Sequence, residues 1–121
     1  MPKKILIVDD SVTIRQMVSF TLRAAQFEVV EAENGADAIK KLGQLTPDLI
    51  VTDLNMPVMD GLTFVRNARA MPATRYVPIL MLTTESHAEK KAQAKAAGAT
   101  GWIVKPFDPP SLLETIAKVL P

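Results

Sequence analysis

Five short apolar runs divide the chain, and a polar or charged residue follows most of them. The runs cover residues 5–8, 27–32, 49–52, 77–82 and 102–104. Their length and β-branched content predict strands, and continuous apolar runs are typical of parallel strands that are buried on both faces. The run 27–32 differs because Glu28 and Glu31 flank Val29 and Val30, a pattern that suits an edge strand.

Apolar residues recur at helical spacing between these runs, so a helix is expected after each strand. The inward positions of the first helix are predicted to be Ile14, Met17, Val18, Thr21, Leu22 and Ala25. Later helices are predicted around residues 38–42, 62–71, 88–97 and 109–120. Asp10 or Ser11 is expected to cap the first helix, and Gly98 is expected to end the fourth.

This alternation of strands and helices predicts an α/β fold in which helices cover both faces of one sheet. In 121 residues there is room for one domain, covering 1–121, with a three-layer, doubly wound, five-stranded parallel sheet. Right-handed crossovers place all the strand carboxyl ends at one edge. In a flavodoxin-like sheet, with the order 2-1-3-4-5, the first, third, fourth and fifth strands are neighbours.

Polar residues that could carry chemistry stand at the ends of these four strands. Asp9 and Asp10 follow the first, Asp53 the third, Thr83 the fourth and Lys105 the fifth. Each alone has an ordinary structural explanation, such as a helix cap or a turn. Their conjunction at one sheet edge is not expected from packing alone, so we predict a binding crevice there.

Three clustered carboxylates would repel one another, which favours raised pKa values or a bound divalent cation. An all-oxygen site suits Mg²⁺. With a cation present, Asp53 could attack phosphorus and form an aspartyl phosphate. Lys105 could then offset the phosphoryl charge as an ammonium, and Thr83 could donate a hydrogen bond.

Composition narrows the alternatives. The net charge is +1 with no long run of like charge, so nothing argues for nonspecific nucleic-acid binding. The chain has no Cys and one His, which excludes thiolate and multi-His metal centres. The apolar run 5–8 is too short for a signal peptide or a membrane span, so we expect a cytoplasmic protein.

Four segments carry a resemblance to a known family: residues 5–11, 53–61, 82–84 and 105–107. On these motifs the sequence resembles response-regulator receiver domains along essentially its whole length. Within that family it is most similar to single-domain chemotaxis regulators of the CheY type. The resemblance implies the CheY-like fold, a two-component signalling role and no output domain.

The resemblance also implies roles for the strand-end residues. Asp53 would accept a phosphoryl group from the phosphohistidine of a CheA-like histidine kinase. Mg²⁺ would be bound by Asp9 (partly through water), Asp10, Asp53 and the backbone carbonyl of Asn55. Thr83 and Lys105 would bind the phosphoryl group, and the peptide bond between Lys105 and Pro106 would be cis. Such a protein catalyses only its own phosphorylation and dephosphorylation.

Two further positions concern switching and lifetime. The family's switch residue, three positions before the lysine, is usually Tyr, Phe or His, whereas here it is Trp102. Because an indole is larger than a phenol ring, we expect its inward movement with Thr83 to be partial. Asn55 and Glu85, each two residues past a phosphate-contacting position, are expected to admit water and allow rapid self-hydrolysis.

By the same resemblance, the output face comprises the helix from residue 88, the strand at Trp102 and the last helix. Lys91 and Lys95 form a like-charge pair one turn apart on that helix, with Lys90 nearby. This basic face is either solvated surface or a docking site for an acidic partner segment. The expected output partner is the flagellar motor switch, with a phosphate sink or a phosphorelay intermediate as the alternative. We expect a monomer that binds neither DNA nor membranes.

Two other protein classes are alternatives. Haloacid-dehalogenase-like phosphatases also use an aspartyl phosphate and Mg²⁺, but their D-x-D motif would fall at Asp9-Asp10-Ser11, which does not fit it. A flavin-binding domain would have to cradle a phosphate after the first strand, where Asp9 and Asp10 would repel it.

Overall fold

The computed structural model describes residues 2–84 and 88–120. Its strands are β1 (Lys4–Val8), β2 (Glu28–Ala32), β3 (Leu49–Asp53), β4 (Ile79–Thr83) and β5 (Gly101–Val104). Its helices are α1 (Val12–Ala24), α2 (Gly35–Leu42), α3 (Gly61–Ala70), α4 (Ala88–Ala97) and α5 (Pro109–Val119), with a short 3-10 helix η1 (Pro72–Thr74).

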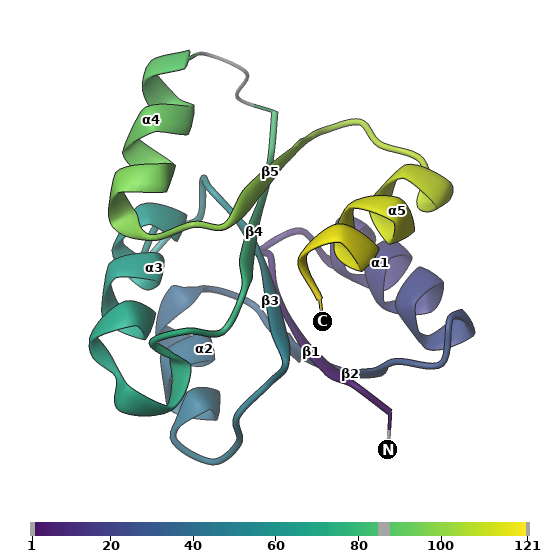
Figure 1. The fold of residues 1–121 in the computed structure, drawn as a ribbon, viewed down its shortest axis with the longest axis horizontal. Coiled ribbons are helices and arrows are strands. Elements are labelled where there is room, and N and C mark those ends of the chain that lie inside the picture. Colours follow the sequence, from purple (N-terminus) through teal and green to yellow (C-terminus); the bar gives the residue numbers. More distant parts are fainter. Residues whose placement is uncertain (1, 85–87, 121) are drawn as a thin grey trace.

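All neighbouring strands pair in parallel, in the order β2-β1-β3-β4-β5. Helices α2, α3 and α4 cover one face of the sheet, and α1 and α5 cover the other (Figure 1). The predicted three-layer fold with strand order 2-1-3-4-5 is therefore confirmed. As expected from its two glutamates, β2 is an edge strand and is only partly buried over most of its length.

The sheet separates two apolar clusters. One lies under α2, α3 and α4 and is centred on Leu6, Ile50 and Phe64. The other lies under α1 and α5 and is centred on Ile5, Val51 and Leu22, so successive residues of one strand serve opposite clusters. Every residue of β3 and β4 is buried, which accounts for the continuous apolar runs there.

Short polar side chains start the helices. Ser11 caps α1 by accepting the N–H of Ile14, which decides between the two predicted caps, and Asp60 caps α3 by accepting the N–H of Thr63. Gly98 follows α4 with a φ of +116°, in the region that only glycine enters readily. The capping residues in the sequence therefore mark the starts of α1 and α3 and the end of α4.

One core assignment is wrong. Met17 was predicted to face inward from the first helix, but it is 38% exposed and lies on the side of α1 that borders α5. Its neighbours Val18 and Leu22 are buried as expected. Among residues 2–84 and 88–120, no helix combines the length and apolar character needed to cross a membrane.

Candidate functional site

Three carboxylates meet where β1 and β3 end. Ligand oxygens of Asp9, Asp10 and Asp53 all lie within 4.8 Å of one another, with Asp9 and Asp53 buried and Asp10 exposed. The pairing of β1 with β3 brings them together, because Val8 lies opposite Thr52 and the acids follow at the same sheet edge. The donors are all oxygen, and the exposed Asp10 leaves one side open to water, a combination that suits Mg²⁺.

The ammonium group of Lys105 lies among these acids. The Lys105 Nζ is 3.2 Å from Oδ2 of Asp9 and 3.4 Å from Oδ1 of Asp53, and the lysine side chain is only 14% exposed. The side chain therefore bridges the ends of β1 and β3 from beyond β5. Such a cation offsets part of the repulsion between the acids and would also attract an incoming anionic group.

The surroundings of Asp53 disfavour the ionised form of its carboxyl group. Burial raises its pKa, the Lys105 ammonium lowers it in part, and the Asp9 carboxylate raises it further. Its Oδ1 also accepts the N–H of Leu54 at 2.9 Å. A buried carboxylate whose ionised form is only partly compensated is the group in this cluster best suited to react or to bind a cation.

Thr83 and Lys105 are joined through the main chain. Thr83 is the buried last residue of β4, lies opposite Val104 and accepts the N–H of Lys105 on its carbonyl at 2.7 Å. The Lys105–Pro106 peptide bond is cis, the isomer that the family resemblance implied. The ends of the third, fourth and fifth strands thus bring Asp53, Thr83 and Lys105 to neighbouring places on one sheet edge.

Two residues, Asn55 and Glu85, are expected to control water access to the site. Asn55 is exposed in the turn after β3. Glu85 lies outside the described residues, so its expected role stays a prediction. Met56 and Met59 in the same turn are partly buried and pack against the apolar cluster under α3.

The start of α3 is pressed against the end of β3. The Gly61 N–H donates to the Leu54 carbonyl at 2.8 Å, and a Cβ at Gly61 would lie 2.3 Å from the Asp53 carbonyl oxygen. No side chain fits there without moving the backbone of Asp53. The sequence does not reveal the contact of Gly61 with Asp53, because that contact depends on how closely the start of α3 approaches the end of β3.

A second unrecognised residue is Arg15 on α1. Its Nη1 donates to the Asp9 carbonyl at 2.7 Å, and its Nε donates to Oε1 of Glu31 on β2 at 3.1 Å. The helical pattern marked Arg15 only as a polar position between apolar ones. No sequence signal connects it to a carbonyl in the preceding turn, because that contact depends on the side-chain conformation.

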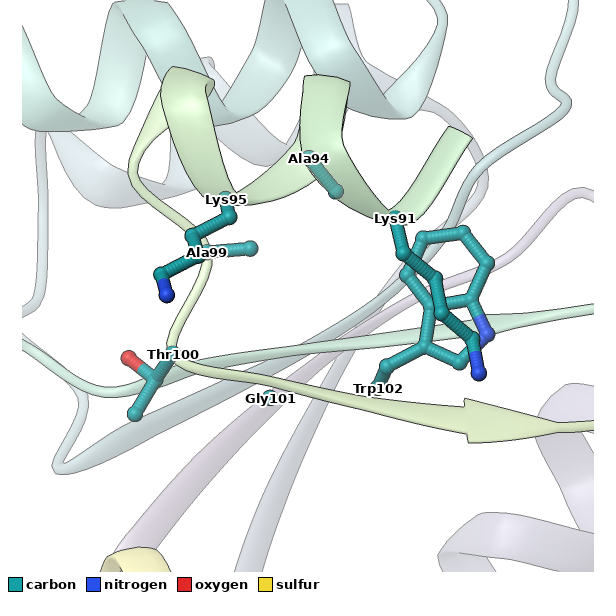
Figure 2. Close-up of a pocket in the computed structure, with 7 residues that line it drawn as sticks. All are labelled: Lys91, Ala94, Lys95, Ala99, Thr100, Gly101 and Trp102. Atoms are coloured by element: carbon teal, nitrogen blue, oxygen red, sulfur yellow. The ribbon is translucent and has the colours of Figure 1, made fainter. Parts of the chain in front are cut away.

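A separate cavity of about 260 Å³ lies between α4 and β5, away from the acids. Figure 2 shows the side chains of Lys91 and Trp102 close together at one end and Lys95 near the other. Trp102 is half-buried against the cluster under α4, and its indole N–H has no acceptor among the described residues. The expected partial movement of this ring stays a prediction.

Comparison with known proteins places these features in a family. The model of the response regulator receiver domain matches residues 5–117. The solved structure of Vibrio cholerae chemotaxis protein CheY4 is 51% identical, covers 99% of this chain and 100% of that one, and superposes with a TM-score of 0.97. Chemotaxis protein CheY-3 of Vibrio cholerae is 41% identical over 96% of this chain and 90% of its own length.

More distant relatives extend the comparison. The phosphate regulon transcriptional regulatory protein PhoB of Escherichia coli is 36% identical over 99% of this chain, which spans only 52% of the PhoB length. The receiver domain of a sensor histidine kinase from Pseudomonas aeruginosa is 26% identical with a TM-score of 0.91 and covers 99% of this chain and 98% of that one. Its structure has a magnesium ion coordinated in the active site cleft. On the family match and the close structural agreement, this chain belongs to the receiver domains of two-component response regulators.

Proposed function

We propose that Asp53 accepts a phosphoryl group from the phosphohistidine of a histidine kinase in the presence of Mg²⁺. The observation that carries the proposal is the cluster of three carboxylates within 4.8 Å, with one lysine ammonium bridging two of them. The family match and the magnesium in the cleft of the Pseudomonas aeruginosa relative support the same chemistry.

In the transfer step, a carboxylate oxygen of Asp53 attacks phosphorus. A new O–P bond forms as the P–N bond to the imidazole breaks, and the electron pair stays on the imidazole nitrogen. The ionised carboxylate is the nucleophile, so the raised pKa of Asp53 should make transfer fall off as the pH decreases.

The other site residues supply charge and hydrogen bonds. A bound Mg²⁺, held by Asp9, Asp10, Asp53 and the Asn55 carbonyl, would neutralise the carboxylates and the phosphoryl oxygens. Lys105 starts between Asp9 and Asp53 and would turn its ammonium to the phosphoryl group, while the Thr83 hydroxyl would donate to it. Asn55 and Glu85 would leave a path for the water that later hydrolyses the acyl phosphate.

Labelling by acetyl phosphate tests the proposal. We expect intact-protein mass spectrometry to find one added phosphoryl group with MgCl₂ and none with EDTA. Asp53→Asn should abolish labelling, because the amide is not a nucleophile. Asp60→Asn is the matched control: it removes an exposed helix-capping acid of the same loop and should leave labelling unchanged. Normal labelling of Asp53→Asn would disprove the assignment.

We further propose that phosphorylation controls binding of a partner protein, with the chemotaxis machinery as the setting. This chain is 51% identical to CheY4 and 41% identical to CheY-3, but only 36% identical to the transcriptional regulatory protein PhoB. These identities favour a role in chemotaxis over a role in transcription control. The cavity between α4 and β5 is bordered by Lys91 and Lys95, which favours an acidic partner segment (Figure 2).

A binding measurement with the flagellar motor switch protein of the same organism separates the alternatives. Phosphorylated protein should bind more tightly than unphosphorylated protein, and Lys91→Glu with Lys95→Glu should weaken binding without changing labelling. If phosphorylation changes neither affinity nor rate, the chain acts as a phosphate sink or relay and not as a motor regulator.

A further inference from the structure

Arg15 connects three elements close to the acidic cluster. It projects from the first turns of α1, its Nη1 donates to the Asp9 carbonyl at 2.7 Å, and its Nε donates to Glu31 at 3.1 Å. The arginine side chain is 17% exposed and that of Glu31 is 30% exposed, so the contacts are largely shielded from water. Glu31 belongs to β2, and its carboxylate orients the guanidinium from one side. On its other side the guanidinium holds the Asp9 carbonyl.

The carbonyl that Arg15 holds belongs to the peptide unit between Asp9 and Asp10. Because a peptide unit is planar, fixing its oxygen fixes the direction in which the chain enters Asp10. The Asp9 carboxylate has its own supports, the N–H of Ser11 at 2.9 Å and the Lys105 ammonium at 3.2 Å. The Asp10 carboxylate has no hydrogen bond or ion pair within the described residues, so only the backbone orients it.

We propose that Arg15 is a positioning residue for cation binding at this site. It holds the peptide unit that aims the Asp10 carboxylate at those of Asp9 and Asp53, and Glu31 keeps the guanidinium in place. The inference rests on the proposed function, because it assigns Arg15 a part in binding the same Mg²⁺. It concerns a residue that touches neither the cation nor the phosphoryl group.

Charge and positioning predict opposite effects of removing Arg15. A guanidinium near the site repels a divalent cation, so by charge alone Arg15→Gln should tighten Mg²⁺ binding. Loss of the hydrogen bond to the Asp9 carbonyl should loosen the Asp10 carboxylate and weaken binding. Outer residues that orient metal ligands typically change affinity by about 10–100-fold, and we expect about tenfold here because Arg15 acts through the main chain.

The experiment titrates MgCl₂ into the protein and follows backbone amide shifts by NMR, without any phosphoryl donor. Arg15→Gln should bind Mg²⁺ about tenfold more weakly than the wild type. Arg15→Lys keeps the charge but not the two-directional guanidinium, and it should also bind more weakly. Arg23→Gln is the matched control, because Arg23 also pairs with Glu31, at 3.6 Å, but does not contact Asp9; its affinity should equal that of the wild type.

Unchanged or tighter binding by Arg15→Gln would overturn the proposal, and so would weakening of Arg23→Gln by the same factor. If Arg15→Gln does not fold, judged from amide dispersion, Arg15→Lys decides: wild-type affinity in that variant overturns positioning. If the wild type itself does not bind Mg²⁺, the proposed function fails and this inference fails with it. Wild-type binding with unaffected Arg15 variants overturns the inference alone.

Discussion

Helices α1 and α4 lie on opposite faces of the sheet, and they differ in how firmly side chains hold them. Helix α1 buries Val18, Ser19, Thr21 and Leu22, whereas Ala94 is the one residue of α4 that is fully buried. Helix α1 is also tied to the acidic site through Arg15. The attachment of α4 lies at its far end, where Arg69 donates to the Gly98 carbonyl at 2.9 Å.

This difference indicates which part of the receiver can change when the site is modified. Helix α4 contributes only the small side chains of Ala94 and the half-buried Ala97 to the apolar cluster, so it is held by less apolar contact of its own than α1, and segments with few buried contacts open at lower free energy. The α1 side would have to expose a Leu and a Val and break the contact with the Asp9 carbonyl. We therefore expect α1 to hold the acids in place, and α4 and β5 to be the segments that move when the site is modified.

The largest expected effect comes from truncating the α1 side. Leu22→Ala removes a fully buried side chain and should lower the free energy of unfolding by about 3 kcal/mol. Ala94→Gly, at the buried position of α4, should lower it by about 1 kcal/mol, mainly through helix propensity. Urea denaturation measures both, and equal losses would contradict the comparison.

A substitution where α4 ends should have the next largest effect. At Gly98, with φ at +116°, a Cβ would lie 2.7 Å from Cγ of Arg69, so Gly98→Ala should lower the free energy of unfolding by about 2 kcal/mol. Gly43 ends α2 at a φ of −71°, and Gly43→Ala is the control, with a change below about 0.5 kcal/mol. Thermal unfolding should separate the two clearly; similar changes would show that α4 tolerates a different ending.

The acidic site should itself be a source of instability. Burial raises the pKa of Asp53, so the neutral form is favoured in the folded state, and the stability this contributes is lost as the pH rises through that pKa. Without Mg²⁺ at pH 7, Asp53→Asn should therefore increase the free energy of unfolding, on the order of 1 kcal/mol. The gain should shrink towards pH 4, and a gain that grew on acidification would contradict this account.

The smallest effect concerns charge on α4. Lys91 and Lys95 are exposed and four residues apart, so Lys91→Glu should replace a repulsion by a favourable pair and stabilise α4 by about 0.5 kcal/mol at low salt. On α5, Lys118 already pairs with Glu114 at 3.6 Å, and Lys118→Glu should be slightly destabilising. Urea denaturation at low and high salt measures both, and the two changes should have opposite signs that fade as salt is added.

The sequence was informative wherever the chain obeyed local rules. Apolar runs predicted the strands, and the topology rules for parallel sheets were enough to expect Asp9, Asp53 and Lys105 at one edge. Met17 was misplaced because helical periodicity marks an apolar stripe but does not say how much of it α5 covers. The contacts of Arg15 with the Asp9 carbonyl and of Gly61 with Asp53 were missed because they depend on side-chain conformation and on how closely two elements approach.

The close fit of Gly61 has a consequence for mutational tolerance. Because a Cβ there would lie 2.3 Å from the Asp53 carbonyl oxygen, any residue at position 61 larger than glycine would displace the backbone of Asp53. Position 61 has no chemical role, yet a saturation library should find it as intolerant as Asp53. Variants at position 61 and variants at Asp53 would then be told apart by whether they lose only labelling or lose folding as well. Receiver engineering that varies this loop has to leave the glycine in place.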